Sequence, residues 1–282
     1  MVERILAADD PRVSDYRGVS EPQLLKTRGL FIAEGRIVVG RLIRDGGWTV
    51  RSVLLSDRAH RELEPVLAAA GDRIPVLVCA SEDFLGITGH HIHRGCLALV
   101  ECRPARSLEE AVQESQLAVV LEDVANADNV GGVFRNVAAF GGDLVVLSPA
   151  CCSPLYRKAI RTSMGATLRV PFVHLTDRWP AALGFLRTAG FHLIAMTPRE
   201  PSETLEDFAS RRRPGRLALV VGAEGAGLTP VVEAEAENLV RIPIAPGVDS
   251  LNLAVATGIA LERLARNGHG RGILAVPKSI QT

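Results

Sequence analysis

The chain has 282 residues, of which 47% are hydrophobic, enough to bury a sizeable core and more than one small domain needs. Lysine plus arginine and aspartate plus glutamate number 32 each, so the formal net charge is zero and binding to nucleic acid would need a local basic surface. Aromatic residues make up 4%, which argues against a surface built mainly for stacking single-stranded bases.

The first residues, MVERILAADDPRVSDYRG, carry charges throughout and lack the apolar segment of a secretory signal peptide. No stretch reaches about 18 uncharged apolar residues, so no membrane-spanning helix is expected. The five cysteines fit neither zinc-ligand spacing nor a disulfide framework. These features together predict a cytoplasmic protein with reduced thiols.

Residues 31–101 alternate between helical and strand-like patterns, which predicts a small α/β unit. Apolar residues recur at helical spacing in two segments, and short aliphatic runs between them are typical of strands. The predicted helices are 33–47 and 61–71, and the predicted strands are 50–56, 75–79 and 96–101. The polar, proline-containing segment 102–115 is then expected to be a linker.

Beyond this linker, short apolar runs alternate with helical stretches. The runs lack polar alternation, which suits strands buried on both faces of a parallel sheet covered by helices. The predicted strands are 117–123, 143–148, 191–196, 217–222 and 239–244, and the predicted helices are 129–140, 153–163, 179–190 and 250–267. The sequence therefore predicts two α/β domains, 1–104 and 105–282, the second with a parallel sheet.

The segment 126–142, NADNVGGVFRNVAAFGG, predicts a helix with an unusual start. Valines and Phe134 form one apolar face, and the other side carries Asn129, Gly132, Arg135 and Asn136. Each glycine costs a helix roughly 1 kcal/mol relative to alanine, so another group is expected to approach the backbone closely there. Either Asn126 or Asp128 can cap the first amides. A capped helix start with a solvated arginine is the structural alternative.

The segment 217–230, LALVVGAEGAGLTP, takes a buried strand straight into a glycine-rich turn that holds one acid, Glu224. Ligands of open α/β sheets bind beyond the carboxyl ends of strands, which marks this turn as a candidate site. Its glycine spacing is neither the dinucleotide fingerprint nor a P-loop. A tight strand-to-helix connection is the alternative, and it would leave the carboxylate without a partner.

The segment 240–268 predicts a strand, a Pro/Gly loop and a long helix that ends at Asn267–Gly268. Ser250 stands at the expected N-cap of this helix. Asn252 is then inside the helix, where asparagine is unfavourable, so a structural role does not explain it. Small residues line this helix, which suits tight packing against another helix or a second subunit: Ala254, Ala256, Thr257, Gly258 and Ala260.

Together, these three segments resemble the three motifs of the SpoU (TrmH-like) RNA ribose 2'-O-methyltransferases, a branch of the SPOUT superfamily. The motifs occur in the family's order, and 153–172 resembles the segment that follows the first one. Residues 29–35 and 93–101 resemble the N-terminal RNA substrate-binding domain of many members. The resemblance covers residues 20–267. It is specific to this family because three motifs match in order, which is stronger evidence than any single motif.

The resemblance implies a reaction that transfers a methyl group from S-adenosylmethionine to a ribose 2'-hydroxyl in tRNA or rRNA. It also implies a C-terminal domain with a deep trefoil knot that cradles this cofactor, although chains are in general unknotted. A homodimer with its active site at the subunit interface is expected as well. The family pattern contains no metal.

The resemblance assigns catalytic positions to five residues: Asn129, Arg135, Glu224, Ser250 and Asn252. It assigns cofactor contacts to Gly222, Ile242, Leu251 and Asn252. The arginine has two possible roles, a base assisted by the RNA phosphate, or a cation that grips the phosphate and steadies the developing alkoxide. CCSPLY (151–156) and HRG (93–95) depart from the usual family residues, which affects RNA contacts rather than catalysis.

Three histidines close together, His90, His91 and His93, suggest metal binding, but no second cluster has recognisable zinc spacing. We therefore expect no metal. Two alternative functions remain open: an inactive RNA-binding adaptor of the same fold, and an RNA base methyltransferase. The intact motif residues argue against the first, and the Asn–Arg motif with Ser-Leu-Asn argues for ribose over base. The sequence selects neither tRNA nor rRNA.

Overall fold

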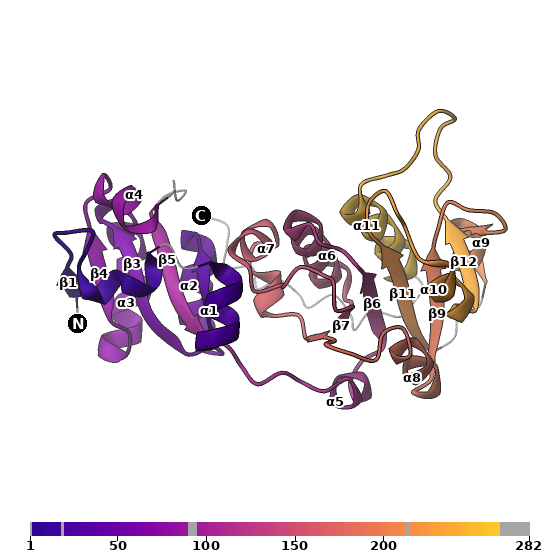
Figure 1. The fold of residues 1–282 in the computed structure, drawn as a ribbon, viewed down its shortest axis with the longest axis horizontal. Coiled ribbons are helices and arrows are strands. Elements are labelled where there is room, and N and C mark those ends of the chain that lie inside the picture. Colours follow the sequence, from indigo (N-terminus) through magenta and orange to yellow (C-terminus); the bar gives the residue numbers. More distant parts are fainter. Residues whose placement is uncertain (1, 18–19, 90–94, 212–214, 266–282) are drawn as a thin grey trace. The chain divides into compact units, whose positions relative to one another are not determined.

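The computed structural model describes residues 2–17, 20–89, 95–211 and 215–265 of the chain (Figure 1). The chain forms two compact units: Met1–Pro104 with Pro154–Gly165, and Ala105–Ser153 with Ala166–Thr282. It therefore leaves the second unit after Ser153, contributes a short segment to the first, and returns. Within the described ranges, no helix combines the length and apolar character that crossing a membrane requires.

The first unit has a five-stranded mixed sheet in the order β1-β4-β3-β5-β2. The neighbours β1, β4 and β3 are parallel, and β5 runs antiparallel to both β3 and β2. The strands are β1 (Val2–Arg4), β2 (Leu30–Glu34), β3 (Val50–Ser56), β4 (Val76–Cys79) and β5 (Cys96–Glu101). The helical elements are η1 (Pro11–Tyr16), α1 (Glu21–Arg28), α2 (Arg36–Asp45), α3 (Asp57–Ala70), η2 (Gly71–Arg73), α4 (Asp83–Thr88) and α7 (Arg157–Thr162).

Strand β2 was missing from the sequence prediction, which began a helix at Ala33. All five residues of β2 are buried, and Gly35 then adopts φ 102°, which ends the strand and starts α2. A glycine tolerates this backbone angle because it has no Cβ. The strands predicted at 50–56 and 96–101 match β3 and β5 residue for residue.

Helix α7 packs on β2 of the first unit, although it follows the first motif in the sequence. Glu21 Oε1 accepts hydrogen bonds from the backbone N–H of Arg157, at 2.6 Å, and from its Nε, at 3.1 Å. Nη1 of Arg161 lies 3.1 Å from Oε1 of Glu34, a carboxylate that is 5% exposed. These contacts hold a segment from the middle of the chain against residues near its start.

The second unit has a seven-stranded sheet in the order β10-β12-β9-β11-β6-β7-β8, in which every pairing between the named strands is parallel. This confirms the predicted parallel α/β sheet. The strands are β6 (Leu117–Glu122), β7 (Leu144–Leu147), β8 (Phe172–His174), β9 (Phe191–Met196), β10 (Glu203–Thr204), β11 (Arg216–Gly222) and β12 (Asn238–Arg241). The helical elements are α5 (Leu108–Gln113), α6 (Ala127–Phe140), η3 (Ala166–Leu168), α8 (Ala182–Thr188), α9 (Leu205–Ser210), α10 (Pro230–Glu235) and α11 (Leu253–Leu264).

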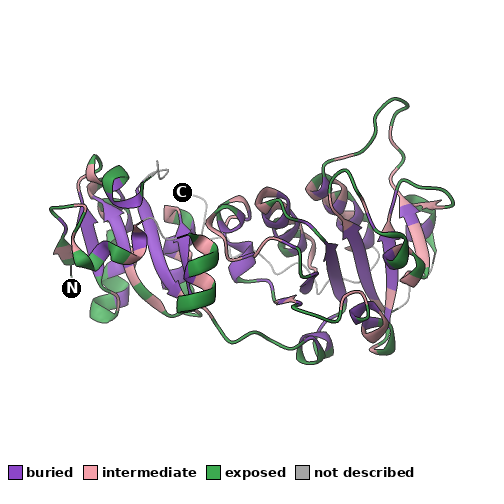
Figure 2. Ribbon diagram, in the orientation of Figure 1, coloured by how far each residue is buried: buried purple, intermediate pink, exposed green. Residues whose placement is uncertain are grey.

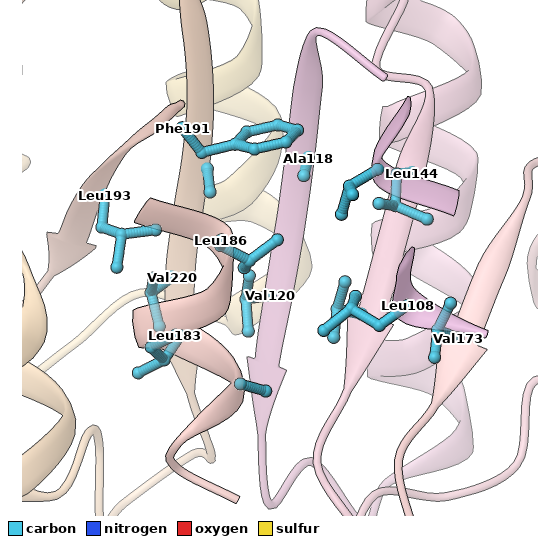
Figure 3. Packing of buried hydrophobic residues seen from close by; sticks show 14 of the residues in the cluster. Leu108, Ala118, Val120, Leu144, Val173, Leu183, Leu186, Phe191, Leu193 and Val220 are labelled. Atoms are coloured by element: carbon cyan, nitrogen blue, oxygen red, sulfur yellow. The ribbon is translucent and has the colours of Figure 1, made fainter. Parts of the chain in front are cut away.

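Central strands of this sheet are buried along their length (Figure 2). On one face, Leu183 and Leu186 of α8 lie against side chains of β6 and β11, and Leu108 of α5 lies near Val173 (Figure 3). Burial on both faces explains why the strand sequences are aliphatic runs without polar alternation. The core thus fixes the sheet whose carboxyl edge carries the three motifs.

The predicted linker at 102–115 is wrong over most of its length, because it contains helix α5. Ser107 Oγ accepts a hydrogen bond from the N–H of Glu110, and the Glu110 carboxylate accepts one from the N–H of Ser107, both at 3.1 Å. This reciprocal pair is a capping box, which the spacing Ser-x-x-Glu could have predicted. The apolar residues of α5 belong to the core of the second unit, so only 102–106 connects.

Candidate active site

The three motifs lie at and beyond the carboxyl ends of strands β6, β11 and β12: the first is largely helix α6, the second is a glycine-rich loop, and the third is a loop followed by helix α11. Because these strands run parallel in one sheet, their carboxyl ends share one edge, where ligands of open α/β sheets bind. Strand β12 ends at Arg241, three residues before the predicted end at Ile244. Pro243 has no N–H to contribute to a sheet, which explains the early end.

The first motif begins helix α6 at Ala127, two residues earlier than predicted. Asn126 is the N-cap, and its Oδ1 accepts a hydrogen bond of 2.9 Å from the N–H of Asp128. Asn129 follows in the first turn and is only 4% exposed. The motif's first turn is therefore capped by one asparagine while another points into buried surroundings.

The close approach predicted for the first motif occurs at Gly132, and helix α11 makes it. A Cβ at Gly132 would lie 2.5 Å from the Cβ of Ala254, and a Cβ at Gly258 would lie 3.0 Å from Nδ2 of Asn136. The amide of Asn136 also donates to the carbonyl of Ala254 at 2.6 Å. The small residues of both helices are thus explained by contact between α6 and α11 within one chain.

Helix α11 begins at Leu253 with Asn252 as its N-cap, so the prediction that Ser250 caps this helix is wrong. Oδ1 of Asn252 accepts a hydrogen bond of 3.2 Å from the N–H of Val255. Asparagine caps a helix as well as serine does, and the irregular loop continues two residues further than expected. The expectation that Asn252 lacks a structural role is also wrong. The predicted helix end at Asn267–Gly268 lies outside the described residues.

The side-chain amide of Asn252 joins all three motifs. Its Nδ2 donates to Oδ1 of Asn129 at 2.9 Å and to Oε1 of Glu224 at 2.7 Å. The same Glu224 oxygen lies 3.4 Å from the N–H of Leu253, at the N-terminus of α11, where a helix favours negative charge. Glu224 is exposed but has partners, and we refer to these three side chains as the Asn129–Glu224–Asn252 cluster.

Of the predicted cofactor contacts, Asn252 is part of this cluster, Leu251 precedes it in the chain, and Gly222 lies two residues before Glu224. Gly222 ends β11, and a Cβ there would lie 2.3 Å from the backbone of Gly227, because the loop folds back with a 2.9 Å bond from the N–H of Gly227 to the carbonyl of Ala223. The loop itself therefore requires this glycine. Ile242 and Leu251 are half-buried and lie at the two ends of the irregular segment between β12 and the α11 cap.

Arg135 and Ser250 form no hydrogen bond with the cluster among the described residues. Arg135 is exposed on α6, six residues and about 240° around the helix from Asn129. Across the described ranges, its side chain forms neither a hydrogen bond nor an ion pair. Ser250 is exposed in the loop before the α11 cap. The structure thus brings together three of the five predicted catalytic residues in one chain.

Glu122 is a residue of this edge that the sequence analysis did not single out. It ends β6 and is 2% exposed. Its carboxylate accepts hydrogen bonds from the N–H of Thr229 at 2.8 Å, from the hydroxyl of Thr229 at 2.9 Å and from Nε1 of Trp179 at 3.4 Å. An acid directly after a buried aliphatic run was the available signal.

The cysteines are free thiols, and burial raises the pKa of Cys96 to about 12. The histidines His90, His91 and His93 lie outside the described residues. Among the residues that the structure describes, histidine, cysteine, aspartate and glutamate form no group of three that could hold a metal ion.

Comparison with known proteins gives consistent matches. Residues 116–262 match the model of the SpoU rRNA Methylase family. A protein of Mycobacterium tuberculosis named "uncharacterized tRNA/rRNA methyltransferase" is 37% identical over 275 residues, covering 96% of this chain and 94% of that protein.

Two solved structures are similar in fold. The AdoMet-bound rRNA methyltransferase of Sinorhizobium meliloti is 26% identical, with a TM-score of 0.78 and coverage of 94% of this chain and 98% of that chain. The SpoU methyltransferase AviRb of Streptomyces viridochromogenes, in complex with AdoMet, is 21% identical, with a TM-score of 0.72 over 90% of this chain and 96% of that one. The second likeness concerns the fold alone.

Proposed function

The chain belongs to the SpoU rRNA methylase family, and from this premise we propose that it transfers a methyl group from S-adenosylmethionine to a ribose 2'-hydroxyl in tRNA or rRNA. The family resemblance predicted from the three motifs is confirmed. The chain is an RNA methyltransferase of this family, and S-adenosylmethionine is its expected cofactor. The ribose hydroxyl as acceptor is the proposal.

One observation carries the proposal: the amide of Asn252 joins the first and second motifs at the carboxyl edge of the parallel sheet. The residues present there suit the cofactor. Ile242 and Leu251 offer half-buried apolar surface to a purine, and Glu224 offers a carboxylate to a cationic group. We propose that Gly222, Ile242, Leu251 and Asn252 hold S-adenosylmethionine, which supplies an electrophilic methyl group on a sulfonium when bound.

The remaining chemistry concerns the acceptor. A ribose hydroxyl is a weak nucleophile, so its proton must leave to a base or its developing charge must be stabilised. We propose that Arg135 holds the RNA phosphate and stabilises the developing alkoxide, since its guanidinium stays cationic and offers a planar fork of donors, while the hydroxyl proton passes to solvent water. The reacting groups are oriented by four polar residues: Asn129, Glu224, Ser250 and Asn252. Orientation alone can lower an activation barrier by several kcal/mol.

A homodimer with a shared active site is part of the proposal. Arg135 lacks a partner among the described residues. In a homodimer, Arg135 of one copy would meet the Asn129–Glu224–Asn252 cluster of the other copy. Exposed apolar side chains of α11 and of the loop before it support such an interface, since Val255 is 53% exposed, Val248 51% and Ile259 38%. Burial of exposed apolar groups of this kind is what stabilises subunit contacts.

Three further elements complete the proposal. The C-terminal segment that carries the third motif is threaded into a deep trefoil knot around the cofactor. Residues 1–104 bind the RNA substrate, and residues 105–282 form the methyltransferase domain, apart from 154–165, which belong to the first compact unit. The protein acts in the cytoplasm, in keeping with five free cysteines.

The test begins with calorimetry of the purified chain with S-adenosylmethionine and with its demethylated product. Mass spectrometry of RNA from a deletion strain then maps the lost modification, with the complemented strain as control. Loss of one 2'-O-methyl nucleotide is the expected result. Loss of a base methyl group would favour the base methyltransferase, and RNA binding without any lost methyl group would favour the inactive adaptor.

A further inference from the structure

Arg199 lies in the loop that follows β9 and makes contacts that none of the three motifs accounts for. Nη1 of Arg199 donates to the carbonyl of Leu228 at 3.0 Å, and Nη2 donates to the carbonyl of Ala226 at 3.2 Å. Both carbonyls belong to the glycine-rich loop, residues 222–229, that follows β11. One guanidinium therefore spans two carbonyl groups of this loop.

The carbonyl of Ala226 belongs to a peptide unit that is held at both ends. Its oxygen, on Ala226, accepts from Arg199, and its N–H, on Gly227, donates to the carbonyl of Ala223 at 2.9 Å. Because a peptide unit is planar, fixing its C=O and its N–H fixes the orientation of the whole unit.

The peptide unit that contains the carbonyl of Leu228 is held in the same way. Its oxygen, on Leu228, accepts from Arg199, and the N–H of the same unit, on Thr229, donates to Oε2 of Glu122 at 2.8 Å. Glu122 is 2% exposed and is the last residue of strand β6. The glycine-rich loop is thus fixed from the sheet side by Glu122 and from the side of the β9 loop by Arg199.

Glu233 of α10 provides the counter-charge. Its Oε1 lies 3.3 Å from Nη1 of Arg199, and in the described part of the chain this buried oxygen accepts no hydrogen bond. Arg199 therefore has two separable roles, an ion pair with Glu233 and a fork on two carbonyls. A lysine could keep the ion pair, but a single ammonium cannot reproduce a planar fork on two carbonyls.

We propose that Arg199 is a positioning residue that holds the glycine-rich loop in the conformation that binds S-adenosylmethionine. The inference rests on the proposed function. Its physical basis is preorganisation: a loop that is already ordered loses less conformational entropy when a ligand binds. Two glycines with positive φ, Gly225 at 85° and Gly227 at 69°, give this loop the freedom that Arg199 removes.

The test compares four variants of the full chain by calorimetry with S-adenosylmethionine. Arg199→Gln and Arg199→Lys are expected to raise the Kd about tenfold, because the glycine-rich loop would then have to be ordered when the ligand binds. Glu233→Gln removes only the ion pair and should leave the Kd within about twofold. Arg187→Gln is the matched control, because Arg187 also contacts α10, through Glu235, but lies away from the loop.

Two further readouts separate positioning from folding. Arg199→Lys should keep a thermal midpoint close to that of the wild type, because the ion pair remains. In methylation assays it should raise KM for S-adenosylmethionine while kcat at saturating cofactor is retained. The inference about Arg199 would be overturned if Arg199→Lys bound S-adenosylmethionine as tightly as the wild type, or if Glu233→Gln lost as much affinity as Arg199→Lys. Either result would leave the proposed function standing. A wild-type chain without affinity for S-adenosylmethionine would overturn the proposed function as well.

Discussion

Asn252 donates a hydrogen bond of 2.9 Å from its side-chain amide to the side-chain oxygen of Asn129, a residue 123 positions earlier in the chain. The acceptor is almost fully buried and the donor side chain caps helix α11, so the bond connects the core of α6 to the start of α11. The second hydrogen of the same amide reaches Glu224. The geometry of the proposed active site therefore depends on one residue being a donor.

Replacing Asn252 with aspartate tests this dependence. The variant keeps an oxygen to cap α11 but places a second acceptor against Asn129 and Glu224. We expect the free energy of unfolding at pH 7 to fall by about 2 kcal/mol, since two hydrogen bonds are lost and two carboxylates repel each other. Urea unfolding at pH 7 and pH 5 measures the effect, which should shrink at pH 5 as protonation of the new acid restores a donor.

Asn252→Ala is the control for this variant. It loses the cap and both amide hydrogen bonds, at a cost of about 1–3 kcal/mol, without adding a charge, so its effect should change less between pH 7 and pH 5 than that of Asn252→Asp. Equal stability of Asn252→Asp and the wild type at pH 7 would contradict the central role of the donor.

The contact between α6 and α11 leads to a second prediction. Gly132→Ala should destabilise the protein by about 1–3 kcal/mol, although alanine is the better helix former, because its Cβ would collide with Ala254. Gly184→Ala in α8 is the matched control, since the nearest atom to its new Cβ is a terminal nitrogen of Arg187 at 4.0 Å. That variant should be neutral or stabilising in denaturant unfolding. A stabilising Gly132→Ala would show that the two helices can move apart at little cost.

The third prediction concerns Arg135. Because its side chain is exposed and lacks a partner in the described ranges, Arg135→Ala should change the free energy of unfolding by no more than about 0.5 kcal/mol. The same variant should abolish methyl transfer and leave the Kd for S-adenosylmethionine nearly unchanged. Arg135→Lys should also be inactive, because lysine cannot form a planar fork on a phosphate. Near-normal turnover by either variant would remove Arg135 from the proposed mechanism.

The fourth prediction concerns pH. Burial lowers the pKa of His174 below its ordinary value of 6.5, despite hydrogen bonds with the backbone at Pro149 and Ser148. The neutral ring is favoured by the fold, so this contribution to stability is present above pH 6.5 and is lost as the pH falls through the lower native pKa. NMR titration should show the lowered pKa directly.

His174→Gln, which cannot titrate, should lose less stability than the wild type between pH 7 and pH 5. If stability changed equally with pH in the two proteins, the assignment of His174 as a half-buried ring that stays neutral would be contradicted.

Local patterns predicted the longer strands of the second unit well, because strands buried on both faces have a simple signature, but they missed the short edge strands β8 and β10 and the short helices α9 and α10. The run at 191–196 matches β9 in full, and the parallel sheet followed from such runs. Elements that depend on side-chain caps or on single glycines were harder to predict. Helix α5 depends on the Ser107–Glu110 capping box, and the end of β2 depends on the positive φ of Gly35.

The candidate site shows the same division. The family pattern selected Asn129, Glu224 and Asn252, and the structure brings them together. Spacing could not show that Asn252 rather than Ser250 caps α11, since both residue types are good caps and the loop length decides. The contacts of Arg199 and Glu122 join strands far apart in sequence, so a single sequence offers no pattern for them.

The excursion of residues 154–165 into the first unit has a consequence for cutting the chain in two. A protease site placed in 102–106 would sever the connection after β5, yet helix α7, which packs on β2, would stay covalently attached to the later piece. The two fragments should therefore remain together through the ion pairs of Arg157 with Glu21 and Arg161 with Glu34 and the packing beneath them. A fragment of residues 105–282 expressed alone would lack strand β2, on which α7 packs. Helix α7 would then expose the surface that it buries in the full chain.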